Sequence, residues 1–410
     1  MRDGGRMAAA LAVLADIDAR HKPARLALKT WADGARYAGA RDRAFVSGLV
    51  LDVLRRRRSL AWGMGEEGDR ARVLGALGLV WDWSPERIAA AAGDAHGPGI
   101  LSLAEQDALA APVSLETAPD AVRGDYPDWL EPHMVRVFGD NRVGEGEALA
   151  ARAPVDLRVN TLKTDLDRAL KALQPFKPRP LERLAGAIRI DAPAAADRAA
   201  PVEAAPEFER GWFEVQDLGS QIAASMAGEI KGKQVLDFCA GGGGKTLAFA
   251  AAMGNSGQLY AYDADARRLT DTVRRGQRAG VRNLQVRSPI HPDALVGLEA
   301  KMDLVFIDAP CTGSGTWRRH PDAKWRLTPE QLSRRVAEQD AVLDSAAPYV
   351  KPAGRLIYVT CSLFAEENED RVAAFLARAP TFTAHAAPLR LTPRTDGADG
   401  FFIAVLSRNG

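Results

Sequence analysis

Apolar residues recur at intervals of three and four over the first part of the chain, a spacing that predicts amphipathic helices. The pattern is clearest in residues 7–17 and 40–60, and the second stretch closes with the four arginines Arg55 to Arg58. Glycines and prolines interrupt it between residues 93 and 125, which predicts short helices and loops there. Residues 1–124 are therefore expected to form an all-helical domain.

The pattern changes between residues 125 and 210, where we expect linker helices and a small α+β module. A helical stretch runs from residue 125 to 138. Residues 156–161 then alternate between polar and apolar and predict a strand, and they are followed by a helical pattern at 165–173 and a second strand at 187–190. The alanine- and proline-rich stretch behind them predicts a loop.

Strands and helices alternate from residue 211 to residue 410, which we expect to form a third domain. Apolar runs that predict strands occupy residues 235–238, 258–262, 283–287, 302–307, 355–359 and 401–406. Helical patterns begin at residue 220 and occupy residues 247–252, 266–279 and 329–349. Such alternation predicts an α/β fold with a mainly parallel, doubly wound sheet, which binds ligands beyond the carboxyl ends of its strands.

The composition is that of a globular protein with several domains. The chain has 410 residues, 47% of them hydrophobic, which is enough for two or three domains with sizeable cores. No apolar segment approaches the ~18 residues of a membrane span, and the polar stretch from Met1 to Met7 lacks the apolar core of a signal peptide. We therefore expect a cytoplasmic protein without a membrane partner.

The net charge and the cysteines limit how the chain can bind nucleic acid, form disulfides or hold a metal. The net charge is +1, so any contact with nucleic acid must come from local basic patches. The three cysteines are Cys239, Cys311 and Cys361. An odd number argues against a disulfide framework, and no spacing of His and Cys resembles a zinc site. We expect free thiols and no metal.

The arginine run Arg55 to Arg58 has two interpretations. Basic side chains in the last turn of a helix interact favourably with the helix dipole. The alternative is a patch that contacts phosphates. Changing these residues to glutamine would lower the melting temperature in the first case, and in the second it would reduce the salt dependence of RNA binding.

A run of four glycines follows the strand at residues 235–238. The sequence reads Cys239-Ala240-Gly241-Gly242-Gly243-Gly244-Lys245-Thr246, and a helical pattern begins directly behind it. Glycines are needed where the backbone approaches a ligand closely or takes a positive φ, and a helix start offers free N–H groups. The spacing is neither G-x-G-x-x-G nor the phosphate-binding G-x-x-x-x-G-K-[ST]. A tight turn without a ligand is the alternative.

The end of the next strand favours a nucleoside ligand. Asp263 directly follows the strand at residues 258–262, and an acidic residue at this place suits a ribose diol. A glycine turn and a strand-end aspartate fit a nucleoside cofactor without a pyrophosphate, such as S-adenosylmethionine.

Two cysteines stand at the ends of two further strands. The strand at residues 302–307 runs into Asp308-Ala309-Pro310-Cys311, and the strand at residues 355–359 runs into Thr360-Cys361-Ser362. If these strands are neighbours of the glycine strand, both thiols face the cofactor pocket. For either cysteine alone, a buried structural role is the alternative.

Two thiols and a carboxylate suit methylation of carbon-5 of cytosine. That carbon is too weak a nucleophile to attack a methyl sulfonium by itself. A thiolate that adds to carbon-6 turns the ring into an enamine-like nucleophile at carbon-5, which is covalent catalysis by cysteine. A carboxylate can hold a proton at ring nitrogen-3, and a second thiol can take part when the product is released.

These motifs resemble those of the RsmB/Sun family of S-adenosylmethionine-dependent RNA cytosine-5 methyltransferases. The matching segments are residues 156–163, 215–220, 239–246, 308–315, 317–325, 360–362 and 399–402. The N-terminal helices resemble the NusB-like RNA-binding domain of the ribosomal members, through residues 41–45 and 54–56. The resemblance implies a class I methyltransferase Rossmann-like sheet, preceded by an RRM-like α+β module and the NusB-like domain, and an RNA substrate. We expect a monomer.

The same resemblance assigns roles to single residues. Cys361 is the nucleophile, Cys311 assists release, Asp308 pairs with the base, and Lys245 lies near it. The cofactor is bound by Cys239, Ala240, Gly241, Gly242, Gly243, Gly244, Lys245, Asp263 and Asp308. Cys239 is expected to pack or to offer its backbone, and not to react.

Two departures from the family pattern concern the cofactor. Gly241-Gly242 stand where the family usually has Ala-Pro, so this loop is expected to be more flexible and to cost affinity. Ser288-Pro289-Ile290 stand where an acid would contact adenine. Two other functions stay open: the same chemistry on transfer RNA, and a non-catalytic RNA-binding or assembly factor on this scaffold. The NusB-like region favours ribosomal RNA.

Overall fold

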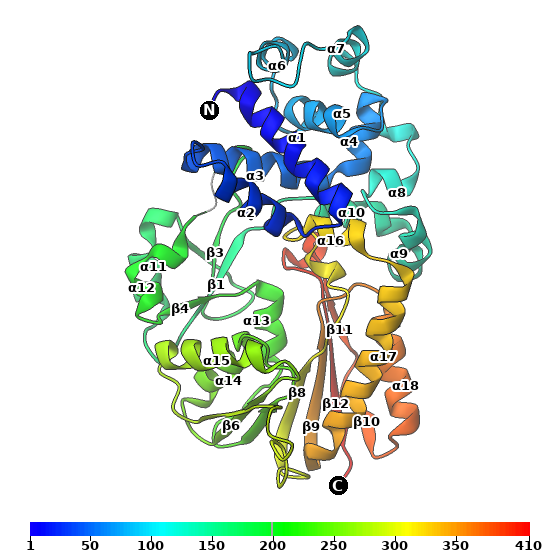
Figure 1. Ribbon diagram of the computed structural model, residues 1–410. Helices are drawn as coiled ribbons and strands as arrows, with labels where there is room; N and C mark the ends of the chain where they lie inside the picture. The colour runs from blue at the N-terminus through cyan, green and yellow to red at the C-terminus, as the bar shows by residue number, and fades with distance from the viewer. Residues whose placement is uncertain (198–199) are drawn as a thin grey trace. The chain divides into compact units, whose positions relative to one another are not determined.

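The computed structural model describes residues 1–197 and 200–410, which divide into two compact units (Figure 1). The first unit comprises residues 1–153, 316–327 and the described part of 192–199. The second comprises residues 154–191, 200–315 and 328–410. The division into three domains at residues 124 and 210 stays a prediction.

The first unit is built of helices, and those between residues 3 and 110 share one apolar core. The α-helices are α1 (Asp3–Arg20), α2 (Ala24–Gly34), α3 (Ala40–Arg55), α4 (Arg57–Met64), α5 (Asp69–Gly75), α6 (Pro85–Ala92), α7 (Leu103–Ala110), α8 (Asp120–Arg123), α9 (Glu131–Phe138), α10 (Arg142–Leu149) and α16 (Pro321–Arg326). A π-helical turn at Ala76–Val80 follows α5. Val13, Phe45 and Leu49 are among the buried core residues. The three- and four-residue spacing of the sequence places such residues on one face of each helix.

We expected one helix over residues 40–60, and the structure has two. The chain leaves the helical conformation at Arg56 (φ −119°, ψ 36°), between α3 and α4. Asp125 supplies the reason, because its Oδ1 accepts hydrogen bonds from the backbone N–H groups of Arg58 (2.9 Å) and Ser59 (3.0 Å). A carboxylate satisfies the free N–H groups of a helix start, so a residue remote in the sequence begins a new helix here.

Of the arginine run, only Arg55 lies in the last turn of a helix, that of α3, whereas Arg57 and Arg58 begin α4. Arg55 is buried and donates to Asp52 at 2.9 Å. Arg57 pairs with Asp18 at 2.6 Å, and Arg58 likewise pairs with an aspartate. Three of the four arginines thus bind carboxylates of their own unit, a structural role that neither sequence interpretation described.

Asp52 holds the most buried of these ion pairs. Its carboxylate accepts hydrogen bonds from Arg55, Arg152 and the indole N–H of Trp81, the last at 2.8 Å. Burial opposes ionisation of Asp52, but the hydrogen bond from Arg152 and the charges of both arginines outweigh it and hold the pKa below its usual value.

We expect Asp52→Asn to lower the free energy of unfolding by roughly 3–5 kcal/mol, since two arginines lose their buried partner. A lowered folded-state pKa means that this stabilisation is present above the unfolded pKa of about 4 and disappears as the pH falls through the folded value. Urea unfolding at pH 7 and at pH 3 measures both effects. The exposed Asp33→Asn is the control, and an equal loss at both pH values would contradict the linkage.

Residues 316–327 pack into the first unit although both of their flanks belong to the second. Lys324 is buried on α16, and its Nζ donates to the carbonyl of Arg55 at 2.8 Å. The indole N–H of Trp325 donates to the carbonyl of Leu54 at 2.6 Å. Burial lowers the pKa of Lys324 to about 8, against the opposing charge of a nearby aspartate. The C-terminal end of α3 is thus capped by this segment.

The second unit contains a small antiparallel sheet with the strand order β2-β3-β1-β4. Its strands are β1 (Val155–Val159), β2 (Arg179–Pro180), β3 (Ala187–Ile190) and β4 (Phe213–Val215), and its helices are α11 (Leu166–Ala172) and α12 (Pro206–Glu209). In the register, Leu157 of β1 lies opposite Ile188 of β3 and Val215 of β4. The α+β pattern predicted from the sequence is present here.

The larger sheet has the order β10-β12-β9-β8-β5-β6-β7, and β11 pairs with β12. Its strands are β5 (Gln234–Asp237), β6 (Gln258–Tyr262), β7 (Leu284–Arg287), β8 (Met302–Asp308), β9 (Val350–Thr360), β10 (Phe382–Ala384), β11 (Leu389–Leu391) and β12 (Phe401–Arg408). Strands β9, β8, β5, β6 and β7 are parallel, and β12 runs antiparallel to β9. The predicted doubly wound sheet is confirmed.

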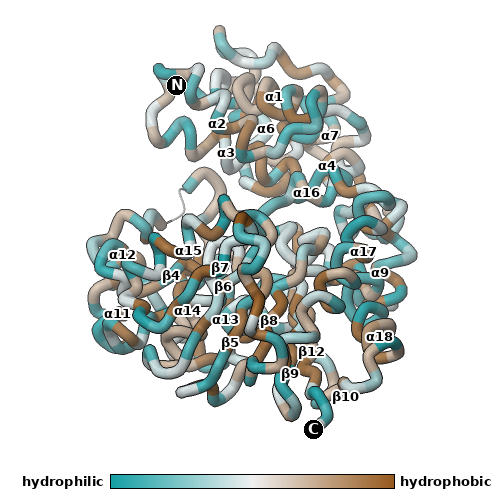
Figure 2. Tube along the Cα trace, turned by 60° about the horizontal axis from the view of Figure 1, so that its bottom comes forward, coloured by the Kyte–Doolittle hydropathy of each residue, from teal (hydrophilic) through white to brown (hydrophobic). Residues whose placement is uncertain are grey.

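Helices cover both faces of this sheet (Figure 1). They are α13 (Leu218–Ser225), α14 (Gly244–Met253), α15 (Ala266–Ala279), α17 (Pro329–Ala346), α18 (Glu369–Arg378) and α19 (Pro393–Asp396). Alternate residues of one strand point to opposite faces. Leu304 and Phe306 of β8 join the core with α13 and α14, whereas Val305 and Ile307 join the core with α17 and α18. Figure 2 shows the hydrophobic colour of β8 and the hydrophilic colour along α17.

None of the helices in residues 1–197 and 200–410 combines the length and the apolar character that crossing a bilayer requires.

Candidate functional site

A cavity of about 190 Å³ lies at the carboxyl ends of the parallel strands. It is lined by Val215, Gln216, Ser220, Asp237, Cys239, Ala240, Gly241, Gly242, Gly244, Lys245, Arg268, Arg275 and Asp308. The structure thus brings the glycine run, Lys245 and Asp308 to one place. Asp263 contacts the glycine loop directly, whereas Cys311 and Cys361 lie outside the lining of this cavity.

The glycine loop takes a conformation that other residues rarely adopt. Gly241 has φ +54° and Gly243 has φ +83°. A Cβ on Gly243 would lie 2.9 Å from the hydroxyl of Thr272, which donates to the carbonyl of Gly241 at 2.9 Å. Glycine is required at these places because only it tolerates the dihedral angles and the close contacts.

Asp263 ties the end of β6 to this loop. Its Oδ2 accepts hydrogen bonds from the backbone N–H of Gly241 at 2.8 Å and from Arg268 at 3.2 Å, and its Oδ1 accepts from the N–H of Asp265. A Cβ on Gly241 would lie 2.6 Å from the Arg268 guanidinium. The glycine at position 241 therefore makes room for an arginine that the strand-end aspartate holds.

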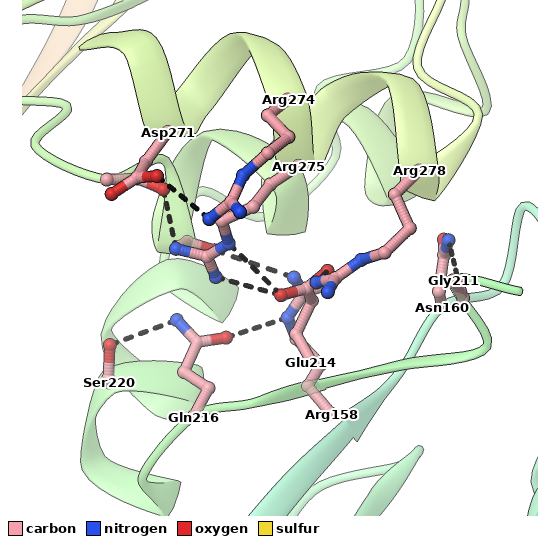
Figure 3. A network of polar contacts seen from close by, with 12 residues as sticks. Arg158, Asn160, Gly211, Glu214, Gln216, Ser220, Asp271, Arg274, Arg275 and Arg278 are labelled. Atoms are coloured by element: carbon pink, nitrogen blue, oxygen red, sulfur yellow. Dashed lines mark hydrogen bonds and ion pairs between the residues drawn. The ribbon is translucent and has the colours of Figure 1, made fainter. Parts of the chain in front are cut away.

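A second arginine fixes the loop from α15, and the sequence analysis missed it (Figure 3). Arg275 donates to the carbonyl of Gly242 at 2.5 Å and to the carboxylate of Glu214 at 2.9 Å. Glu214 is buried on β4 and also accepts from Arg278 at 2.6 Å. The loop that lacks the usual proline is thus held by side chains. The many arginines in residues 266–279 could have indicated such a contact, but the sequence does not tell which of them faces the glycine loop.

The same network reaches the small sheet. Arg158 of β1 donates through Nε to the side-chain oxygen of Gln216 at 2.7 Å, and Gln216 donates to Ser220 at 3.0 Å (Figure 3). Burial lowers the pKa of Arg158 to about 10, with the Glu214 carboxylate opposing this and the Arg275 charge adding to it. Residues of the α+β module therefore form one wall of the cavity.

Lys245 and Asp308 form an ion pair inside the cavity, with Nζ and Oδ2 2.6 Å apart. Burial alone would lower the pKa of Lys245, but the Asp308 carboxylate and the negative charge of a Cys361 thiolate outweigh it and raise the pKa. Behind them, Asp237 accepts a hydrogen bond from Thr246 at 2.6 Å, and burial raises its pKa to about 7. The cavity thus offers a fixed ammonium beside a carboxylate.

The two strand-end cysteines lie against each other. The Sγ atoms of Cys311 and Cys361 are 3.3 Å apart, within hydrogen-bond distance for sulfur. This hydrogen bond, together with burial, raises the pKa of Cys311 well above its usual range. Cys239 is different: burial raises its pKa, and it packs beside the core under α17 and α18. Cys311 and Cys361 are therefore close enough together to act on the same part of a substrate.

Within the described residues, no cluster of three or more His, Cys, Asp and Glu side chains could hold a metal ion. The cavity offers one lysine and carboxylates, and the paired thiols of Cys311 and Cys361 lie outside its lining.

Known proteins resemble this chain in sequence and in fold. The sequence model of the family described as 16S rRNA methyltransferase RsmB/F matches residues 227–407. A ribosomal RNA small subunit methyltransferase B from Citrobacter koseri is 34% identical over 314 residues, which are 74% of this chain and 70% of that protein.

Two solved structures share the fold. PH0851 superposes with a TM-score of 0.75 at 24% identity, covering 100% of this chain and 99% of that one. NSun6 from Pyrococcus horikoshii, solved with SFG, superposes with a TM-score of 0.61 at 19% identity, covering 69% of this chain and 98% of that one. The class I methyltransferase sheet predicted from the sequence is confirmed by this similarity.

Proposed function

Since this chain belongs to the 16S rRNA methyltransferase RsmB/F family, we propose that it methylates carbon-5 of a cytosine in ribosomal RNA through a covalent bond to Cys361. The chain is an RNA methyltransferase with S-adenosylmethionine as its cofactor. The choice of cytosine-5 rests on one observation, the 3.3 Å between the sulfurs of Cys311 and Cys361. Methyl transfer to a nitrogen or oxygen atom needs no pair of thiols.

The site fits the cofactor. The glycine loop lines the cavity with its backbone, and the backbone N–H of Gly241 donates to the carboxylate of Asp263. S-adenosylmethionine supplies an electrophilic methyl group on a sulfonium. The glycine backbone, Lys245 and Asp308 would hold it, with the Asp263 carboxylate toward the ribose.

The residues of the chain then supply the remaining steps. The Cys361 thiolate forms a bond to carbon-6, and the ring electron pair moves to carbon-5, which takes the methyl group. Asp308 holds a proton at ring nitrogen-3. After Cys361 has bonded to carbon-6, Cys311 loses its thiol proton to solvent, and its thiolate takes the proton from carbon-5. The ring double bond returns, and the bond between carbon-6 and sulfur breaks, which frees Cys361 as a thiolate.

The division of labour between the thiols has electrostatic support. The raised pKa of Cys311 keeps it a thiol before the reaction. The Lys245 ammonium interacts with the other sulfur, that of Cys361.

Bisulfite sequencing of total RNA from a deletion strain, with and without the restored gene, tests the proposal. One cytosine of ribosomal RNA should lose its methyl group in the deletion strain and regain it on complementation. A lost site in transfer RNA would instead favour the same chemistry on the other substrate. Unchanged RNA, together with no cofactor binding by the purified protein, would favour the non-catalytic alternative.

Asp263→Ala is expected to weaken binding of S-adenosylmethionine. It removes a charge-assisted hydrogen bond of about 1.5–3 kcal/mol, so the dissociation constant should rise roughly tenfold to a hundredfold. Titration calorimetry measures the change, and Asp271→Ala on the exposed face of α15 is the matched control. Unchanged affinity would remove Asp263 from the cofactor site.

A further inference from the structure

Glu367 is a fully buried carboxylate six residues beyond Cys361, in a short 3₁₀ turn at Ala365–Glu367. Its Oε1 accepts hydrogen bonds from the backbone N–H of Thr312 at 2.8 Å and from Gln339 at 3.0 Å. Its Oε2 accepts from the hydroxyl of Thr312 at 2.5 Å and from the hydroxyl of Ser362. Four donors therefore converge on one side chain.

Two of the residues that donate to Glu367 lie next to the two cysteines in the chain. Thr312 directly follows Cys311, and Ser362 directly follows Cys361, so Glu367 links the two chain segments that carry the thiols. We propose that Glu367 is a positioning residue that holds the two cysteines against each other. The role of the two cysteines in catalysis rests on the proposed function. The hydrogen bonds that hold them in place do not depend on it.

The turn that carries Glu367 is itself fixed. Its backbone carbonyl accepts a hydrogen bond from the hydroxyl of Tyr358 at 2.7 Å. The neighbouring Asn368 accepts from Thr360 at 2.5 Å and donates to the carbonyl of Ser362 at 3.0 Å. A buried carboxylate costs stability unless it is hydrogen-bonded, and here the bonds go to both cysteine segments. A carboxylate bound to both segments can therefore fix the distance between the two sulfurs.

Charge gives Glu367 a second effect. The hydrogen bond to Cys361 and burial raise the pKa of Cys311, and Glu367 adds to this when it is ionised. Burial raises the pKa of Glu367 as well, so its effect on Cys311 is full only above that raised pKa. Lys245, the nearby cation, instead interacts with Cys361. The two sulfurs thus face opposite charges although they touch.

Cross-linking of the thiols by diamide measures the positioning without RNA. The two thiols give up two protons and two electrons to the azo group of diamide, which becomes a hydrazine, and the sulfurs join in a disulfide. We expect wild type to cross-link rapidly and Glu367→Ala at least about tenfold more slowly, with binding of S-adenosylmethionine within about twofold. Glu369→Gln, on the exposed start of α18, should behave as wild type.

Glu367→Gln tests the charge of residue 367 apart from its hydrogen bonds, because the variant keeps the shape of the side chain and loses the charge. An amide can still accept from the backbone N–H of Thr312 and donate to the hydroxyls, so cross-linking should stay within about threefold of wild type. Without the charge, alkylation of Cys311 by iodoacetamide, followed by mass spectrometry across a pH series, should begin at lower pH. An unchanged alkylation profile would overturn the charge effect.

Unchanged cross-linking in Glu367→Ala would overturn the positioning role. If Glu367→Ala fails to bind the cofactor, Glu367→Asp takes its place: the shorter carboxylate cannot reach both hydroxyls, and cross-linking should slow while the charge remains. Because these readouts use no RNA, a wild-type protein that cross-links as expected but methylates no RNA would refute the proposed function and leave the role of Glu367 standing.

Discussion

Cys361→Ala is expected to abolish methyl transfer to RNA. Without the sulfur that adds to carbon-6, carbon-5 is never activated, and loss of a nucleophile that acts with its partners lowers a rate by more than about a thousandfold. Transfer of a tritiated methyl group to ribosomal RNA measures the loss. No covalent complex with RNA should form, because the sulfur that makes the bond is absent.

Two controls make this result specific. Binding of S-adenosylmethionine should stay within about twofold of wild type, because Cys361 lies outside the lining of the cavity. Glu369→Gln, at the exposed start of α18, should retain methyl transfer. If Cys361→Ala still methylates RNA, the covalent mechanism is wrong for this protein.

Cys311→Ala is expected to trap the enzyme on its substrate. Addition of Cys361 and methyl transfer can still occur, but no thiol at position 311 remains to remove the proton from carbon-5. The bond between carbon-6 and sulfur then persists, and protein accumulates covalently on RNA. A denaturing gel should show a slowly migrating band.

The band must depend on every partner of the reaction. It should disappear without RNA, without cofactor, and in the double variant that also carries Cys361→Ala. The opposite pattern, an adduct in Cys361→Ala that Cys311→Ala abolishes, would exchange the roles of the two sulfurs. Loss of the band in both single variants, with normal methylation, would exclude the adduct altogether.

Periodicity and spacing predicted the parts of the molecule that lie close together in the sequence. The parallel sheet followed from apolar runs at regular distances, and the glycine loop followed from the four glycines behind β5. Strand ends meet at one edge of such a sheet, which is why Cys311 and Cys361 could be expected near each other. These inferences need only local pattern and one topological rule.

Contacts between remote residues could not be predicted in this way. Nothing in the stretch 40–60 indicates that Asp125 caps a new helix at Arg58. The links from Arg275 to the cofactor loop and from Glu367 to both thiol segments are hydrogen bonds between side chains far apart in the chain. A side chain that acts through such bonds leaves no periodic signal, so it becomes visible only in three dimensions.

The route of the chain restricts how this protein can be taken apart or recombined. Residues 316–327 follow the Cys311 segment yet bury Lys324 and bind Trp325 among the N-terminal helices. A recombination point between residues 153 and 154 would separate these residues from their partners and leave a buried cation and an indole without their hydrogen bonds. Exchange of the helical region between homologues must therefore bring along a matching piece from the other end of the gene, and the two pieces are expected to vary together.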